Sequence, residues 1–402
     1  MRKHEIKIAM LSTGEEVLQG DIDDTNASWL SARLFELGLM LHRRVTVGDE
    51  IDAIVAELIA CSQVSDVVIV NGGLGPTSDD VTAEAMAAAM KTKLVLNKTW
   101  FDEMQQFFQR SGRQMPQSNL KQAMLPQGAG MIFNQVGTAC GFKALLNGCW
   151  FYFTPGVPTE FKHMIENAIL PELLERFQDA EKTQLQRFYT FGLSESLLND
   201  KFNALDLPSD CRLGYRSAIP FIEVKLFAPR EQNIAELSKA IKDIIGSHLV
   251  STNQTMLNSI AALLSANNIS LAIFEPFTAG FLSSWLSEHP TFDTLLKFAA
   301  VTDSKRNRIS SLSELVDMVA NLKTANSVSI ALTCQQIKEN VIGIAMAADK
   351  ANYACEIEFS RKLGLKEQKQ YISTFMLDML RRYLDDIEVI VPAGPLQILQ
   401  KL

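Results

Sequence analysis

One loop constrains the fold of this chain more than any other segment of its sequence. The β-branched run at residues 66–70 leads directly into the glycine-rich loop 71–80, and an alanine-rich helical segment begins near Val81. A strand, a glycine turn and a helix in this order are typical of a βαβ unit in a parallel sheet. Ligands of such sheets bind beyond the carboxyl ends of the strands. We therefore expect loop 71–80 to lie in a binding site.

The same alternation of strands and helices extends along the chain. Apolar residues 6–11 predict a buried first strand, and apolar side chains at steps of three and four predict helices after residues 25 and 51. Further strands are predicted at residues 39–47, 150–153, 221–227, 270–274, 327–332, 341–347 and 353–359, with a final helix at 367–383. The polar stretch 251–255 is typical of a linker. The predicted fold class is α/β.

A chain of 402 residues is longer than a single hydrophobic core usually organises. We expect three domains, at residues 1–172, 173–252 and 253–402. The N-terminal domain is a three-layer α/β unit, the middle domain a small α/β unit, and the C-terminal domain a third α/β unit.

Composition limits the partners of the chain. The chain is 47% apolar, as is usual for a globular protein. Its net charge of −8 and its pI near 5.3 argue against binding to nucleic acid, because nucleic-acid-binding proteins usually carry basic patches. No apolar run reaches the ~18 residues of a membrane helix. The six cysteines form no C-x-x-C pair, which favours buried thiols in the cytoplasm. The expected partner is a small-molecule nucleotide, without nucleic acid or membrane, and a homodimer is the default assembly.

The loop has the chemistry of a phosphate site. Gly72, Gly73 and Gly75 let consecutive backbone N–H groups converge, and the following helix adds its N-terminal amides. The paired carboxylates Asp79 and Asp80 would repel an anion unless a cation bridges them, so we expect a divalent metal, either Mg²⁺, Mn²⁺ or Co²⁺. The alternative is a strand-to-helix turn in which one aspartate caps the helix.

Three other segments are expected to complete the rim of this site. An acidic cluster at residues 15–24 contains Glu16 and Asp24, which would join Asp79 and Asp80 as metal ligands. Residues 134–142 form a polar turn that supplies further amides. Residues 154–160 follow the strand at 150–153.

Five motifs in this order resemble the competence/damage-inducible protein CinA family. They are T-G-E-E-x-L-x-G-x-I-x-D-T-N at 13–26, N-G-G-L-G-P-T-S-D-D-x-T at 71–82, N-x-K-Q-A-x-L-P at 119–126, V-G-T-A-C-G-F at 136–142 and P-G-V-P-T-E-F at 155–161. The resemblance covers the first ~250 residues and implies a molybdopterin-binding-like fold for the N-terminal domain. It also implies a metal-dependent pyrophosphatase that hydrolyses ADP-ribose to AMP and ribose 5-phosphate.

Combining the resemblance with the loop chemistry gives a set of expected site residues. Asp79 and Asp80 would be catalytic, holding the cation and orienting water. The expected substrate-binding residues are Thr13, Gly14, Asn26, Gly72, Gly73, Gly75, Thr77, Lys121, Gly137, Thr138 and Gly156.

The C-terminal domain departs from the family pattern. Related chains carry an E-S-C-T-G-G turn of a nicotinamide-nucleotide amidase, in which the serine is the nucleophile. The matching residues here are Glu275, Pro276, Thr278 and Gly280, with Phe277 and Ala279 between them. Proline has no hydroxyl to attack an amide, so we expect this to be a degenerate amidase site that has lost deamidase activity. Ser283 and Ser284 in the following helix are the available substitutes.

Two other functions remain open at this point. The chain would be a non-catalytic binder or sensor of nicotinamide-derived or pterin-like nucleotides if it binds ADP-ribose without cleaving it. A role in cofactor assembly is suggested only by the shared fold, which is a weak argument for function.

Overall fold

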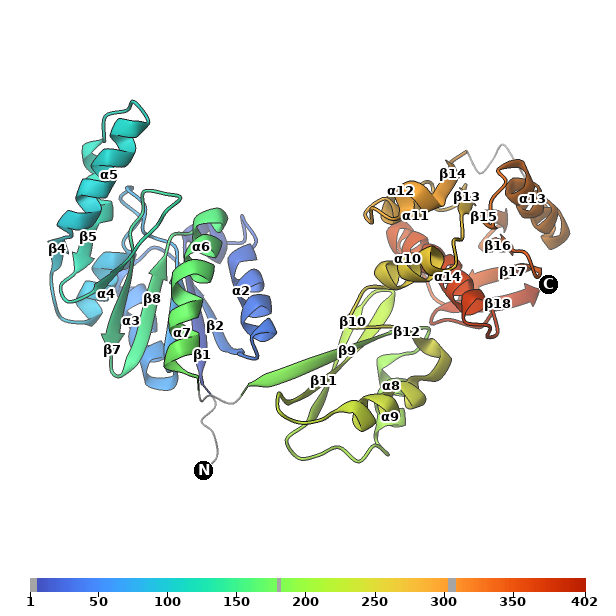
Figure 1. Ribbon diagram of the computed structural model, residues 1–402, viewed down its shortest axis with the longest axis horizontal. Helices are drawn as coiled ribbons and strands as arrows, with labels where there is room; N and C mark the ends of the chain where they lie inside the picture. The colour runs from blue at the N-terminus through green and yellow to red at the C-terminus, as the bar shows by residue number, and fades with distance from the viewer. Residues whose placement is uncertain (1–5, 179–181, 303–308) are drawn as a thin grey trace. The chain divides into compact units, whose positions relative to one another are not determined.

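The computed structural model describes residues 6–178, 182–302 and 309–402 and divides the chain into two compact units (Figure 1). The first unit comprises the residues up to 184 together with 229–231, and the second comprises 185–228 and 232–402. Within the described ranges, no helix has both the length and the apolar character needed to span a membrane.

The first unit is built on a six-stranded sheet with the order β2-β1-β3-β8-β7-β6. The first four strands of this order are parallel, and the last two are antiparallel to their neighbours. The strands are β1 (Ile8–Thr13), β2 (Leu41–Val47), β3 (Val67–Asn71), β6 (Gly130–Ile132), β7 (Gly141–Leu146) and β8 (Cys149–Thr154), and a separate pair is formed by β4 (Leu94–Leu96) and β5 (Met124–Pro126). The helices are α1 (Glu15–Leu18), α2 (Thr25–Glu36), α3 (Ile51–Val64), α4 (Thr82–Ala89), α5 (Lys98–Arg110), η1 (Gln117–Ala123), α6 (Pro158–Met164), η2 (Ile165–Ile169) and α7 (Leu170–Arg176).

Helices cover both faces of this sheet, so its inner parallel strands β1, β3 and β8 are largely apolar on both sides, whereas the edge strand β2 is half-exposed. Side chains alternate along a strand. Ile8 and Met10 of β1 therefore pack in a core with α2, α6 and α7, whereas Ala9 and Leu11 pack in the core formed with α3 and α4. Strands buried on both faces read as continuous apolar runs. The predicted α/β fold class, with a three-layer N-terminal domain, is confirmed.

The glycine loop after β3 passes unusually close to two neighbouring elements. Gly72 has a φ of +109° and Gly73 a φ of +64°. A Cβ atom on Gly72 would lie 2.3 Å from the Thr13 carbonyl oxygen, and one on Gly73 would lie 2.0 Å from Thr82 Oγ1. Glycine is required at both positions because of the conformation and because of the space.

The second unit contains two sheets. The first has the order β10-β11-β9-β12, and the second has the order β14-β13-β15-β16-β17-β18. The strands are β9 (Thr183–Phe191), β10 (Arg212–Ala218), β11 (Phe221–Pro229), β12 (Leu249–Thr252), β13 (Leu271–Phe274), β14 (Leu296–Ala300), β15 (Ile330–Lys338), β16 (Val341–Ala347), β17 (Asn352–Phe359) and β18 (Leu396–Lys401). The helices are α8 (Glu195–Phe202), α9 (Ala235–Ile245), η3 (Gly246–His248), α10 (Met256–Ala266), α11 (Phe281–Leu286), α12 (Phe292–Leu295), α13 (Leu312–Ala325) and α14 (Leu365–Leu384).

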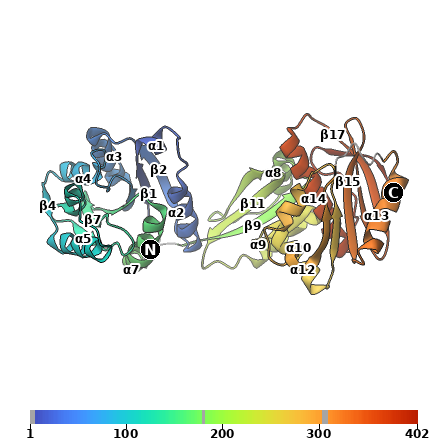
Figure 2. The ribbon, with the colours of Figure 1, turned by 90° about the horizontal axis from the view of Figure 1, so that it is seen from above.

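The six-stranded sheet of this unit is also covered on both faces. Helices α13 and α14 lie on opposite sides of β15 (Figure 2). In this sheet β14, β13 and β15 are parallel, and the remaining strands pair antiparallel. One detail differs from the sequence-based expectation: residues 251 and 252 of the predicted linker belong to β12, because they pair with β9.

A buried ionic network connects α14 to the smaller sheet of the second unit. Asp378 accepts bonds from Arg381 Nη2 at 2.7 Å and from Arg382 Nε at 2.6 Å. Both guanidinium groups also donate to the Ser247 carbonyl oxygen in η3, at 2.9 and 3.0 Å. All three charged side chains are buried, so each depends on the others for compensation of its lost hydration.

The loop geometry gives a stability prediction. Gly73→Ala should lower the free energy of unfolding of the first unit by about 2 kcal/mol, because the methyl group adds a steric clash to the strain of positive φ. Gly20→Ala is the matched control, since Gly20 has a φ of +82° but no atom within 4 Å of its Cβ position. The measurement is tryptophan fluorescence in urea in a Trp285→Phe background, which leaves Trp29, Trp100 and Trp150 of the first unit as reporters. Equal losses for the two glycines would exclude the steric contribution.

The ionic network gives a second prediction. Asp378→Ala should cost about 3–5 kcal/mol of stability, because it leaves two buried guanidinium groups without their carboxylate. Asp385→Ala removes a partner of Arg381 whose side chain is 40% exposed, and its cost should stay below about 1 kcal/mol. Thermal unfolding followed by circular dichroism measures both, and a mild effect of Asp378→Ala would contradict the role given to the network.

Candidate functional site

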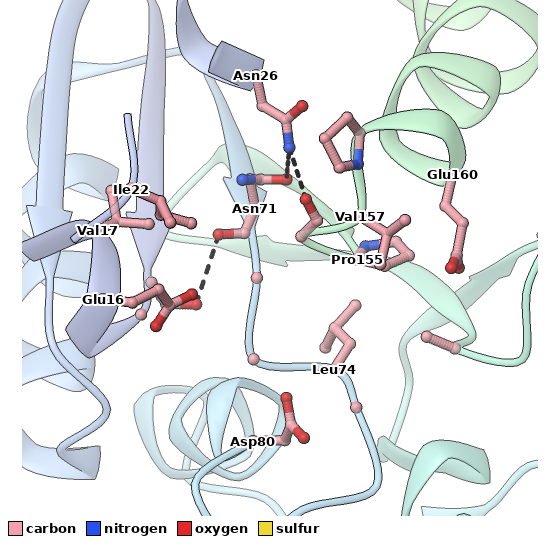
Figure 3. Close-up of a pocket in the computed structure, with 18 of the residues that line it drawn as sticks. Glu16, Val17, Ile22, Asn26, Asn71, Leu74, Asp80, Pro155, Val157 and Glu160 are labelled. Atoms are coloured by element: carbon pink, nitrogen blue, oxygen red, sulfur yellow. Dashed lines mark hydrogen bonds between the residues drawn. The ribbon is translucent and has the colours of Figure 1, made fainter. Parts of the chain in front are cut away.

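A cavity of about 500 Å³ lies beyond the carboxyl ends of β1, β3 and β8 (Figure 3). This is the edge where a parallel sheet presents its ligand sites. Most of the residues that the sequence predicted for the site meet here. Those that line the cavity are Thr13, Gly14, Glu16, Asp24, Asn26, Gly72, Gly73, Gly75, Asp79, Asp80, Thr138 and Gly156.

Asn26 connects two of the strand ends that frame the cavity, those of β3 and β8. Its Nδ2 donates to Asn71 Oδ1 at 3.2 Å and to the Gly156 carbonyl oxygen at 2.8 Å. Asn26 and Asn71 lie beside one another above the loop in Figure 3. The Asn26 Oδ1 atom is buried and has no hydrogen-bond partner in the described protein. Because buried acceptors are normally satisfied, this oxygen is available to a ligand donor.

The two threonines beneath the loop hold its backbone in place. Thr13 Oγ1 lies 3.1 Å from Thr82 Oγ1 and 3.5 Å from the Asn71 carbonyl oxygen. These contacts join the end of β1 to the start of α4, and the glycine loop passes between them.

Three predicted residues lie outside the lining of the cavity. Lys121 Nζ donates to the Thr77 carbonyl oxygen at 3.0 Å and is 3.8 Å from a Glu84 carboxylate oxygen, so it anchors the loop from behind. Thr77 donates its hydroxyl to Asp80 Oδ2 at 2.5 Å. Gly137 lies against Glu160, whose Oε2 would be 1.9 Å from an added Cβ.

Sequence reasoning missed part of the acidic lining. Asp49 lines the cavity although it was not predicted, and Glu160 lines it as part of the predicted rim segment 154–160, in which it was not singled out as a site residue. Glu160 belongs to the P-G-V-P-T-E-F motif, which was a usable signal. Asp49 follows β2, and its place at the same sheet edge was the available clue.

The carboxylates differ in how they are held. Burial, followed by the negative charges of Glu16 and Asp79, raises the pKa of Asp49. The Thr77 hydrogen bond and the charge of Lys121 lower the pKa of Asp79. Asp24 accepts from the Ala27 amide at 2.8 Å and from Ser12 Oγ at 2.7 Å, as an ordinary helix cap does.

The side chains expected to hold a divalent metal are not grouped at one point in this arrangement. Within the part of the chain that the structure describes, no three His, Cys, Asp or Glu side chains are grouped to hold a metal ion. The Asp24 carboxylate caps the N-terminus of α2 by accepting a hydrogen bond from the Ala27 amide. Asp80 Oδ2 accepts hydrogen bonds from the amide and from the hydroxyl of Thr77. Glu16, Asp24, Asp79 and Asp80 therefore line one cavity without converging on one point.

A second group of polar residues lies at the carboxyl end of β13 in the second unit. Glu275 is fully buried there and accepts from Thr278 Oγ1 at 2.5 Å, from the amides of Leu282 and Ser283 at 2.9 Å, and from Ser283 Oγ. Thr278 is itself fully buried, whereas Ser283 is half-buried. The structure thus pairs a serine hydroxyl with a buried carboxylate close to Pro276.

The residues around Glu275 include further polar atoms without protein partners. Both side-chain polar atoms of Gln335 and the Thr333 hydroxyl are buried and unpaired among the described residues. Thr333 is the register partner of Phe274, the last residue of β13. Polar groups of this kind normally bind water or a ligand, so this strand end is chemically equipped as a site.

Comparison with known proteins supports the fold and corrects the function. Residues 9–175 match a family model described as a probable molybdopterin binding domain. A protein of Shewanella oneidensis is 43% identical over 308 residues, covering 76% of this chain and 73% of its own length, and is named nicotinamide-nucleotide amidohydrolase PncC.

That relative contradicts two sequence-based predictions. The expected ADP-ribose pyrophosphatase activity and the expected loss of deamidase activity are both wrong, because the name of this relative indicates an amidohydrolase. The sequence analysis equated the missing hydroxyl at Pro276 with a missing reaction. The structure shows that Ser283, seven residues further along, contacts the Glu275 carboxylate of the same turn.

Two further relatives match nearly the whole chain. A CinA-like protein of Shewanella piezotolerans is 38% identical over 98% of this chain and 100% of its own length. A CinA-like protein of Escherichia coli is 39% identical over 99% of both chains. With this similarity over its full length, the chain belongs to the CinA-like protein family.

Proposed function

We propose that this chain hydrolyses the carboxamide of a nicotinamide nucleotide to the carboxylate, with release of ammonia. The observation that carries the proposal is the 43% identity to a protein named nicotinamide-nucleotide amidohydrolase. The second unit supplies a matching group in the contact between the Ser283 hydroxyl and the buried Glu275 carboxylate.

The proposed reaction uses Ser283 as the nucleophile and Glu275 as the general base. Ser283 Oγ attacks the amide carbon while its proton passes to Glu275. Glu275 returns this proton to the departing ammonia as the C–N bond breaks and an ester forms on Ser283. Water then cleaves the ester, giving the carboxylate and restoring the serine. Pro276 takes no part because it has no hydroxyl.

The structural surroundings of Glu275 support the role of base. The Glu275 carboxylate accepts hydrogen bonds from the backbone amides of Leu282 and Ser283 at the start of α11. These bonds fix the position of the carboxylate relative to the Ser283 hydroxyl. Preorganisation of this kind lowers the cost of reaching the reactive geometry.

We also propose that the cavity of the first unit binds a small nucleotide. The supporting observation is the unpartnered Asn26 Oδ1 beside the glycine loop. A sugar hydroxyl or a ring amine would satisfy this acceptor.

We place the proposed activity in the cytoplasm. All six cysteines of the chain are free and buried, as is usual in a reducing compartment.

The proposal is tested by ammonia release from nicotinamide mononucleotide. Wild type should turn over the substrate, and Ser283→Ala should lower the rate by roughly 10³-fold, in line with the loss of a nucleophile. Ser287→Ala is the matched control, because this exposed serine donates to the Ser284 carbonyl oxygen and has no bond to Glu275. Its rate should stay near that of wild type.

The two possible failures are separate. Wild type that releases no ammonia would reject the proposed function as a whole. A Ser283→Ala variant that is folded by circular dichroism and fully active would reject the nucleophile alone.

A further inference from the structure

The smaller sheet of the second unit has one face covered by α8 and α9, and its other face meets the core of the six-stranded sheet at Phe191 and Phe221. Val224 and Leu226 of β11 pack in a core with α8 and α9. Because side chains alternate along a strand, Phe221, Glu223 and Lys225 point to the other face. Figure 1 shows α8 and α9 together beside the strands β9 and β11.

A cluster of three cations surrounds one carboxylate on the face of the sheet that carries Phe221. Glu223 is 1% exposed, with Arg216 Nε at 2.7 Å, Arg187 Nε at 3.1 Å and Lys225 Nζ at 3.6 Å from its oxygens. The side chains of Arg187 and Arg216 are 40% and 59% exposed. One buried negative charge therefore positions three positive charges that reach solvent, and the cluster has an excess charge of about +2.

A pocket of about 330 Å³ is lined by Phe221, which precedes Glu223 by two residues on β11. The β10–β11 hairpin contributes Phe221 to the wall of the pocket. The other residues that matter for the argument are Phe281, Trp285 and Glu288 on and after α11, and Gln370 and Thr374 on α14. The hydroxyl of Thr374 is buried without a partner among the described residues.

The chemistry of the pocket suits a flat ring that carries positive charge. Aromatic faces attract cations and stack on planar rings. Glu288 adds a negative charge at the rim, and Gln370 and Thr374 offer hydrogen bonds to a polar substituent on the ring.

Strand geometry links the pocket to the cation cluster. Phe221 and Glu223 are on the same face of β11 and therefore about 7 Å apart. Arg216 is the direct register partner of Glu223 across the β10–β11 pair. An aromatic pocket and a phosphate-sized anion site are thus separated by a short spacer, as the ring and phosphate of a mononucleotide are separated by one sugar.

We propose that this pocket and cation cluster together form a binding site for a mononucleotide with a cationic ring. The ring lies against Trp285, Phe281 and Phe221, and the phosphate lies on Arg216 and Arg187. Nicotinamide mononucleotide has this chemistry, and its choice as the probe rests on the proposed function.

The site is distinct from the proposed reaction centre. Residues 281, 284, 285 and 288 are spaced so that they share the pocket side of α11. Ser283 points away from that side and toward Glu275. A ligand in the pocket therefore contacts one side of the helix whose other side carries the serine.

The test compares nicotinamide mononucleotide with its riboside, which lacks the phosphate, by titration calorimetry on the full chain. Wild type should bind the mononucleotide at least about tenfold more tightly than the riboside, as expected for charge-assisted bonds to phosphate. Arg216→Ala should remove this difference. Trp285→Ala should weaken both ligands to a similar extent, because it removes a ring contact.

Arg212→Ala is the matched control for Arg216→Ala. Arg212 lies on the same face of β10, where its guanidinium stacks on Phe227, four residues from Arg216. This variant loses the same charge and should keep the tenfold preference for phosphate. An unchanged preference in Arg216→Ala, or no binding to wild type, would overturn the inference.

The outcome is separable from that of the proposed function. Ser283→Ala should bind nicotinamide mononucleotide with the phosphate preference of wild type while releasing no ammonia. Arg216-dependent binding by a wild type that releases no ammonia would support the binding site and reject the amidohydrolase activity.

Discussion

The buried contact between Asp378 and two arginines is the interaction on which the second unit depends. Asp378, Arg381 and Arg382 lie on α14, and both arginines reach the Ser247 carbonyl oxygen next to the smaller sheet. Buried charges are stable only when every partner is present, so the network favours one relative placement of α14 and η3. The pocket lined by Phe221 and Thr374 requires that placement, because its walls come from the β10–β11 hairpin and from α14.

The first unit could be predicted largely from local sequence patterns. The inner parallel strands β1, β3 and β8 are largely apolar runs because both faces of the sheet are covered there, and glycine and polar residues follow these runs where the chain turns. Such signals are local, so β3, the loop after it and the start of α4 were found correctly. The meeting of Thr13, Asn26 and Gly156 at one edge followed from the parallel topology, which places the carboxyl ends of the strands together.

The features that the sequence left undetected depend on contacts between distant residues. Nothing local indicates that Arg187 and Glu223 meet, since they are on different strands and their pairing requires the register of the whole sheet. The arrangement of the acidic residues around the first cavity could not be derived from the sequence for a similar reason. Glu16 and Asp80 line one cavity, but Glu16 is placed by α1 and Asp80 is held by its hydrogen bond to Thr77 in the loop. Carboxylates that lie at the same edge of a sheet need not be close enough together to bind one metal ion.

The distribution of charge on this acidic chain has a consequence for phosphate ligands. The cavity of the first unit is lined by at least seven carboxylates, including Asp23, Asp49 and Glu160, and Lys121 lies behind its loop. The smaller sheet of the second unit instead carries three cations around one buried carboxylate. Coulomb interactions at partly exposed sites amount to a few kcal/mol over contact distances, enough to determine where an anion resides. The charges therefore favour a phosphate group at the second unit, the same unit in which Ser283 contacts Glu275, whereas the first unit offers its proposed nucleotide an acceptor for a sugar hydroxyl or a ring amine.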